Sequence, residues 1–411
     1  MTVKRWYRRR RRSASAALRE SQWLLPLIGV LIGVFLSLLV DSTNWDSDPD
    51  NWAITVDRAR DTMMSILAIL FAGLAIVLSL STMTASTVAS RFSLRLLVVY
   101  LRSMANKVVI AMFMMTTTFM ILEQARMAGL AADDLAPRPA VVMSGALLIL
   151  SGLAIIWHIN WTLQSIRVDR TIRRVATSTL RSANTIERAR RGYDSATTSS
   201  LSAPPGAEVL VAPDSGYYVR SDVTALVQIA EQHRLVICVD VMTGAHLVTG
   251  APYGWVSSVA SHAVDEDVRG AIGDALDVED SRDPGRDVGF GIRILVDIAL
   301  MALSPAINDP YTAVLCIDQL AVLFTSLPAS PSGPMTWTAE SGGGKVIVNA
   351  PTLGQYLDEA TVEIAMYGAG DERVIAALAN VAASAERTAI TPDDRAAATR
   401  TASNLADAAS R

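Results

Sequence analysis

The chain has 411 residues, of which 51% are hydrophobic, and its mean hydropathy is +0.32. This apolar content exceeds the roughly 45–50% of ordinary soluble domains and predicts membrane-spanning segments. The net charge of −4 hides a division, because residues 1–194 hold 24 basic and 13 acidic residues, whereas residues 195–411 hold 12 and 27. The acidic second half argues against nucleic acid as a partner, since such binding depends on clustered Lys and Arg.

Four apolar segments predict four transmembrane helices, at about 23–40, 62–90, 108–130 and 140–161. Residues 1–22 and the segments that follow the second and fourth helices are basic, whereas residues 41–61 contain six aspartates. Because basic segments stay in the cytoplasm, both termini are expected there. The basic segments are also expected to attract anionic lipids.

The second of these helices carries a stripe of hydroxyl groups towards its inner end. Ser79, Thr82, Ser86 and Ser90 follow one another at i, i+3, i+7 and i+11, which places them on one helical face. Such a face either bonds to neighbouring helices and to its own backbone, or lines a hydrated pathway. In the first helix, Gly29 and Gly33 form a GxxxG motif that permits close contact with another helix.

Two ionisable residues stand near the outer end of the third helix. Glu123 and Arg126 are i,i+3 neighbours, and charged groups at membrane depth are candidates for function. They equally fit a local pair at a helix end whose side chains reach for water. At the inner end of the fourth helix, His158 stands between Trp157 and Trp161 and is expected to be an interfacial anchor.

The second half predicts an α+β region in four parts. Residues 162–194 are expected to form a basic juxtamembrane helix, 195–205 a linker, 206–260 a small β-rich, barrel-like module, and 261–411 a mainly helical region with a disordered stretch at 328–344. The module is similar in layout to the barrels of biotinyl and lipoyl carriers. The chain has no lysine between Lys107 and Lys345, which excludes the swinging-arm role of those carriers.

The densest polar cluster of the second half surrounds two predicted helices. Arg293 and Asp297 are i,i+4 neighbours, and Asn308 and Asp309 precede Pro310, so that Asp309 fits a helix N-cap. A buried aspartate could serve as a general base or fix the corner between the helices. The sequence lacks familiar nucleophile, phosphate-binding and metal motifs, so we expect no catalytic residue, cofactor or metal, and no enzyme.

Two segments of this region resemble a known family. Residues 289–300 and 303–313 are similar to the signature of a bacterial family of predicted multi-pass membrane proteins of unknown function, whose pattern includes SPxINDPxTA. The likeness extends to residues 91–93, 215–217, 250–252 and 367–371, while Ala306 and Tyr253 depart from the pattern. The resemblance implies a multi-pass architecture in a bacterial plasma membrane and brings no established activity.

These observations leave two hypotheses for the function. In the first, the protein is an oligomeric channel or gate with a cytoplasmic sensing domain, and symmetry supplies the pore because four helices are too few to enclose a wide one. In the second, it is a non-conducting membrane-anchored scaffold or binding module. The hydroxyl stripe favours the first hypothesis.

Overall fold

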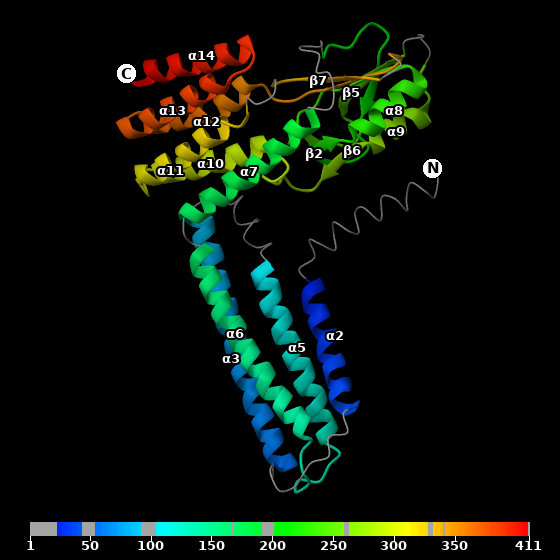
Figure 1. Ribbon diagram of the computed structural model, residues 1–411, viewed down its shortest axis with the longest axis vertical. Coiled ribbons are helices and arrows are strands. Elements are labelled where there is room, and N and C mark those ends of the chain that lie inside the picture. Colours follow the sequence, from blue (N-terminus) through cyan, green and yellow to red (C-terminus); the bar gives the residue numbers. More distant parts are fainter. Residues whose placement is uncertain are drawn as a thin grey trace. The chain divides into compact units, whose positions relative to one another are not determined.

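The computed structural model describes residues 23–42, 54–91, 104–165, 168–190, 201–258, 263–327, 332–339 and 342–409 (Figure 1). The chain divides into two compact units, Met1–Arg167 and Val168–Arg411. The first contains four apolar helices and the second combines helices with mixed sheets, so the predicted fold class is confirmed. The basic segment 1–22 and most of the expected linker lie outside the described residues.

The described residues of the first unit form α2 (Leu24–Ser42), α3 (Val56–Arg91), α5 (Met104–Met127) and α6 (Arg138–Ser165). Each of these four helices is long and apolar enough to cross a membrane. Their shared core includes Met63, Leu70, Phe113, Phe119 and Leu147. At one end the connecting segments are paired, since the amide of Val56 donates to the carbonyl of Asp134 at 2.9 Å and that of Ala136 to Ile54 at 2.9 Å.

Helices α2 and α5 pack backbone against backbone at the GxxxG motif. A Cβ atom added at Gly29 would lie 2.2 Å from the carbonyl oxygen of Ala111, and one added at Gly33 would lie 2.5 Å from that of Met115. Only glycine fits at this separation, and the close contact increases dispersion between the helices. The motif is therefore used within the protomer.

We predict that Gly29→Ala destabilises the first unit by about 1–3 kcal/mol, because the added methyl group has to push α5 away. Gly145→Ala is the matched control, since a Cβ atom at Gly145 in α6 meets nothing within 4 Å. Thermal unfolding in detergent measures the difference. Equal unfolding temperatures for the two variants would contradict the close α2–α5 contact.

The second unit contains two open sheets. The larger has the strand order β1-β5-β3-β8-β7, with β3 and β8 parallel and the other pairs antiparallel, and the smaller has the order β4-β2-β6. The strands are β1 (Glu208–Val211), β2 (Gly216–Ser221), β3 (Leu235–Val239), β4 (His246–Leu247), β5 (Pro252–Ser258), β6 (Leu276–Glu279), β7 (Met335–Thr338) and β8 (Lys345–Val348).

The β-rich module differs from the expectation in closure and extent. Its strands form no closed barrel within the described residues, and two of them, β6 and β7, come from parts of the region 261–411 in which no strand was expected. Strand β7 also lies inside the stretch 328–344, which was expected to be disordered. Trp337 and Val346 are buried with Ile237 and Val256 in one core, so the burial of these apolar side chains stabilises the late strands.

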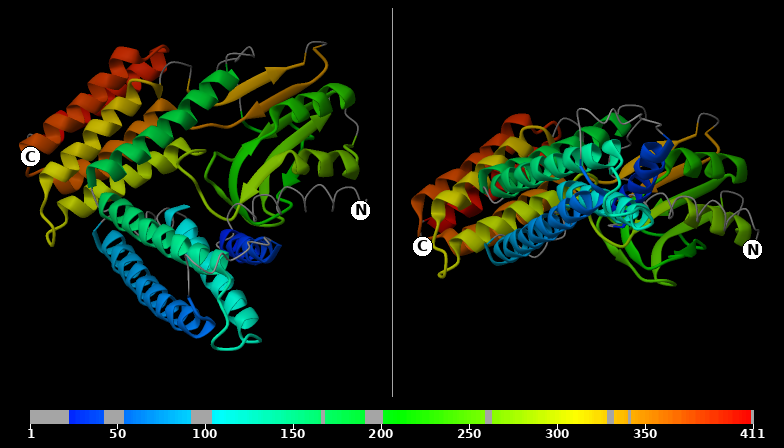
Figure 2. Two further views of the ribbon diagram at one scale, coloured as in Figure 1. Left: turned by 60° about the horizontal axis from the view of Figure 1, so that its bottom comes forward. Right: turned by 90° about the horizontal axis from the view of Figure 1, so that it is seen from below.

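Six helices form a layer beside the sheets, as the views in Figure 2 show. They are α7 (Val168–Arg190), α10 (Val288–Leu303), α11 (Pro310–Phe324), α12 (Leu353–Gly368), α13 (Glu372–Thr388) and α14 (Pro392–Ala409), whereas α8 (Val223–His233) and α9 (Glu266–Asp274) accompany the sheets. The basic helix α7 is an integral part of this layer. Its residues Ile172, Val175 and Ala176 are buried, and Thr179 occupies the space in which Gly291 lacks a side chain.

Both cysteines of the chain are buried in the second unit. Burial, with a smaller effect of Asp240, raises the pKa of the Cys238 thiol to about 12, and burial likewise raises the pKa of Cys316. At pH 8 both groups are therefore protonated, and the thiol is the unreactive form.

We predict that a thiol reagent such as DTNB modifies neither cysteine in the native protein and both after denaturation. Rapid modification of the native protein would contradict this burial.

Candidate functional site

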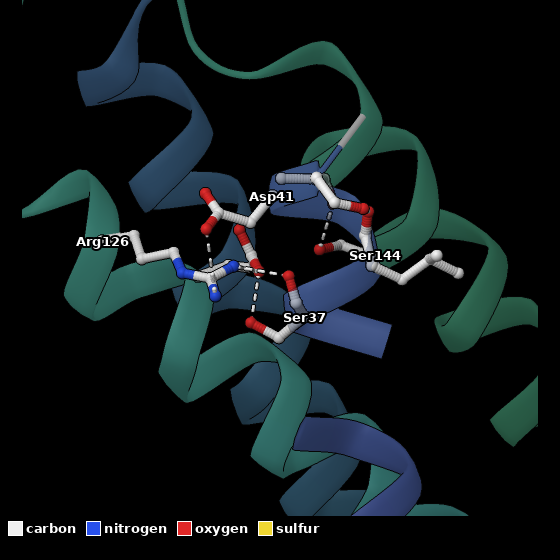
Figure 3. A network of polar contacts seen from close by, with 8 residues as sticks. Ser37, Asp41, Arg126 and Ser144 are labelled. Carbon is white, nitrogen blue, oxygen red and sulfur yellow. Dashed lines mark hydrogen bonds and ion pairs between the residues drawn. The ribbon is translucent and has the colours of Figure 1, made fainter. Parts of the chain in front are cut away.

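A polar network joins α2 and α5 near one end of the first unit. The carboxylate of Glu123 is only 3% exposed. It accepts hydrogen bonds from the Ser37 hydroxyl at 2.6 Å and from Arg126 Nη1 at 2.9 Å. Arg126 also donates to the carbonyl of Ser37 at 2.5 Å and lies 3.8 Å from Asp41, and Figure 3 shows it pointing at both residues of α2. The predicted Glu123–Arg126 pair is therefore part of an interhelical network.

Sequence reasoning missed the α2 members of this network. Ser37 follows Gly29 and Gly33 at a spacing of four residues, which places all three on one face of α2. That spacing was the available signal, because a GxxxG face in contact with α5 carries Ser37 to the same helix. The Ser37 hydroxyl and Arg126 both donate to Glu123, so the arrangement can hold this carboxylate away from water.

We predict that Arg126→Met destabilises the first unit by about 3 kcal/mol, because it leaves a buried carboxylate without its cation. Arg58→Met removes an exposed arginine from α3 and serves as the control. The unfolding temperature in detergent is the readout. Combining Arg126→Met with Glu123→Gln should recover part of the loss; no recovery would show that Arg126 acts through packing alone.

A second polar cluster lies inside the bundle towards its other end. His158 is fully buried, and its Nε2 lies 3.2 Å from the Ser81 hydroxyl and 3.5 Å from that of Thr162. The Ser81 hydroxyl also lies 3.4 Å from the side-chain oxygen of Asn106. The expectation that His158 is an interfacial anchor is wrong, because its side chain is fully buried and its Nε2 bonds to Ser81 of α3. Between the two clusters, Thr116 and Ser151 bond to each other at 3.0 Å.

The hydroxyl stripe of α3 points away from this interior. Ser79, Thr82 and Ser86 are exposed, whereas the buried hydroxyl of α3 belongs to Thr84; the side chain of Ser90 lies outside the described residues. The stripe continues along the same face with small residues. The full face has alternating spacings of three and four residues and consists of Ser65, Ala68, Ala72, Ala75, Ser79, Thr82 and Ser86, all exposed. We call it the α3 seam.

In the second unit, the predicted Arg293–Asp297 pair is present and has further partners. Arg293 Nε donates to Asp297 at 2.8 Å, and its Nη1 and Nη2 donate to the two carboxylate oxygens of Glu363 at 2.6 and 3.0 Å. Nη1 also lies 3.3 Å from Glu359. The bond to Glu363, with Asp297 nearby, raises the pKa of the guanidinium. Two acidic residues of α12 thus complete the cluster. The i,i+4 spacing predicted the Arg293–Asp297 bond but could not predict partners from another helix.

Asn308 and Asp309 make a separate corner between α10 and α11. Asp309 caps α11 by accepting from the amide of Thr312 at 3.1 Å and its hydroxyl at 2.6 Å, as the sequence predicted. Asn308 has a φ of 47°, the left-handed conformation that asparagine tolerates better than most residues. The hydrogen bonds that Asp309 and Asn308 make among the described residues stay within this corner, which is the arrangement expected of a structural turn.

The described parts of the chain contain no cluster of side chains suited to binding a metal ion. Within these ranges, no three or more His, Cys, Asp or Glu residues are grouped so that they could hold an ion. The acidic residues of the two clusters described above, Glu123, Asp297 and Glu363, are instead paired with arginines.

Comparisons with known proteins agree with the membrane architecture. Residues 19–384 match the family described as "Predicted membrane protein (DUF2254)". The chain is 28% identical over 397 residues to uncharacterized proteins of Mycobacterium bovis and Mycobacterium tuberculosis, an alignment that covers 94% of this chain and 76% of each relative. No solved structure matches the chain.

Proposed function

The chain belongs to the DUF2254 family of predicted membrane proteins, and we propose that it assembles into a homo-oligomeric channel or gate of the bacterial plasma membrane, with the second unit as a cytoplasmic sensing domain. The observation that carries this proposal is the exposed α3 seam. Both termini are cytoplasmic in this proposal, because the basic segments flank the inner ends of the helices.

The filled interior of the bundle supports a pathway between protomers in preference to one within a protomer. Phe113, Phe119 and Met120 are buried in the centre of the first unit, and the interior hydroxyls of Thr116 and Ser151 are bonded to each other. Packed side chains leave no continuous aqueous route along such a bundle. A route for ions or small solutes therefore has to be built by several copies around an axis.

The α3 seam has the composition of a helix–helix interface in a membrane. Small side chains let helices approach closely, and a repeat of seven residues keeps the same face turned towards a left-handed partner. Its half nearer the start of α3 is alanine-rich, at Ala68, Ala72 and Ala75, and its other half carries the hydroxyls of Ser79, Thr82 and Ser86. Around an axis, the alanines would form an apolar constriction and the hydroxyls a hydrated entrance.

A cross-linking experiment tests the assembly. We predict that Ser79→Cys forms an intermolecular disulfide on mild oxidation in liposomes, because the seams of neighbouring copies meet at this position. Ile149→Cys is the control, since Ile149 is an equally lipid-accessible residue of α6 that lies off the seam. Cross-linking at both positions to the same extent would indicate random collision and would remove support for the seam as the interface.

A conductance measurement in liposomes tests the channel itself. Thr82→Leu should reduce the conductance because it replaces a hydroxyl of the entrance by a larger apolar group, whereas Thr82→Ser should preserve it. Both variants should still cross-link through Ser79→Cys. An assembled protein without conductance would leave only the second hypothesis.

That alternative, a non-conducting scaffold or binding module, has one observation in its favour. The Thr82 hydroxyl donates to the carbonyl of Leu78 at 2.9 Å, so it is already satisfied within its own helix and needs no water. In this alternative the seam still joins protomers, and the acidic second unit recruits a basic partner.

A further inference from the structure

One end of the helical layer in the second unit exposes large apolar and aromatic side chains. The exposed fractions are 68% for Tyr311, 68% for Met366, 64% for Tyr367 and 39% for Ile307. Single exposed residues of this kind are common, but a group of them marks an interaction surface. We refer to these four residues as the end surface.

The end surface is built from two corners that touch. A Cβ atom added at Gly368, the last residue of α12, would lie 3.3 Å from the side chain of Leu303 at the end of α10. Met366 and Tyr367 immediately precede this contact, and Ile307 and Tyr311 flank the turn that follows Leu303. The α10–α11 and α12–α13 corners therefore lie at the same end of the layer.

The first corner is rigid. The amide of Asn308 donates to the carbonyl of Ser304 at 2.9 Å, and that of Asp309 donates to Ala302 at 2.8 Å. The Ser304 hydroxyl donates to Met301 at 2.6 Å. A turn fixed in this way presents Ile307 and Tyr311 in one conformation, so little conformational entropy is lost when they bind.

The direction of α7 shows which end of the layer this is. Thr179 packs against Gly291, and Figures 1 and 2 show α7 and α10 running in opposite directions. Val168, the first residue of α7, lies eleven residues before Thr179, and Ala302, beside the corner, lies eleven residues after Gly291. Because the two helices are antiparallel, these equal distances bring Val168 and Ala302 to the same end. The end surface therefore lies at the end of the layer where α7 begins.

Chain connectivity ties this same end to the membrane. Helix α6 is apolar enough to span a bilayer and ends at Ser165, and only two residues separate it from Val168. Three peptide steps reach at most about 10 Å. Whatever angle the two units adopt, the beginning of α7 stays within that distance of the end of a membrane helix.

The charges at this end suit an anionic surface. Arg170, Arg173 and Arg174 are exposed on the first two turns of α7. Beside the end surface, Asp371 pairs with Arg373 at 2.6 Å and Asp309 caps α11, while Asp169 of α7 and Glu372 of α13 are exposed. The three arginines of α7 exceed these two exposed acidic groups by one. Arginines near a bilayer are attracted by anionic headgroups, and tyrosines favour the boundary between headgroups and acyl chains.

From these observations we propose that the end surface, Ile307, Tyr311, Met366 and Tyr367, is a lipid-binding surface that rests in the headgroup region of the anionic leaflet beside α6. The second unit would then be held at the membrane in two ways, by its covalent link to α6 and by direct contact with lipid. It requires only that the chain spans the membrane, and it stands whether or not the assembly conducts.

The test places an environment-sensitive fluorophore, NBD, on Tyr311→Cys in the full-length protein reconstituted in nanodiscs. The bilayers contain phosphatidylcholine and phosphatidylglycerol, with or without a lipid that carries a nitroxide quencher at the headgroup end of its acyl chain. Ile390→Cys is the matched control: Ile390 is also exposed, and it lies at the opposite end of the layer, because nearby Thr388 bonds to the carbonyl of Phe324 at the end of α11. The native cysteines are buried.

We expect a blue-shifted emission at position 311 and a loss of fluorescence with the quencher lipid, with neither effect at position 390. Replacing phosphatidylglycerol by phosphatidylcholine should weaken the quenching at 311. Equal quenching at both positions would overturn the proposal, as would no quenching at 311. A blue shift at 311 without quenching would also overturn it and would assign the surface to a protein, such as a second copy of this chain.

A second variant separates lipid contact from folding. Tyr311→Ser with Tyr367→Ser should leave the unfolding temperature unchanged, because both side chains are exposed, and should abolish the quenching of NBD on Ile307→Cys. Unchanged quenching in this variant would show that the tyrosines do not hold the surface at the bilayer.

Discussion

The arrangement of the first unit depends on the cost of a polar group without a partner in hydrocarbon. No water is available at that depth, so each charge or hydroxyl has to bond to the protein itself. Glu123, Arg126 and Ser37 meet this requirement between α2 and α5, and Nε2 of His158 meets it with Ser81 between α6 and α3, whereas Nδ1 of His158 is buried without a hydrogen-bond partner among the described residues. These contacts lie near the two ends of the bundle and link different pairs of helices.

The same constraint divides the small residues into two groups with different roles. Gly29 and Gly33 bring α2 against α5 inside one protomer, so this motif is not available to a second copy. The α3 seam, by contrast, has no partner helix among the described residues of its own chain. Its hydroxyl at Thr82 is satisfied by the backbone, which lets the seam face either lipid or another protomer without an energetic penalty. Close packing and the seven-residue repeat are the reasons for which we propose the second of these.

Local patterns in the sequence predicted the elements well. The charge-free runs identified the four apolar helices, and Asp309 with Pro310 identified the start of α11, because a cap depends on neighbours only three residues away. Contacts between distant segments were not predictable in this way. The parallel pair β3–β8 joins residues more than one hundred positions apart, and Glu363 reaches Arg293 from another helix.

The sequence did not show whether the hydroxyl face of α3 turns inwards or outwards, and this gap had the largest effect on the functional interpretation. The spacing of Ser79, Thr82 and Ser86 showed that they share a face, but periodicity does not tell whether a face turns inwards or outwards when both sides of a helix are apolar. The same limit applied to His158, whose burial depends on Ser81 and Asn106 from two other helices.

The central claim is that copies of this chain meet through the α3 seam, and the most direct measurement is an electron cryomicroscopy structure of the full-length protein in lipid nanodiscs. The account predicts a ring in which α3 lies closest to the axis and Ser79, Thr82 and Ser86 face it. A monomer, or a ring in which the seam faces lipid, would contradict the account.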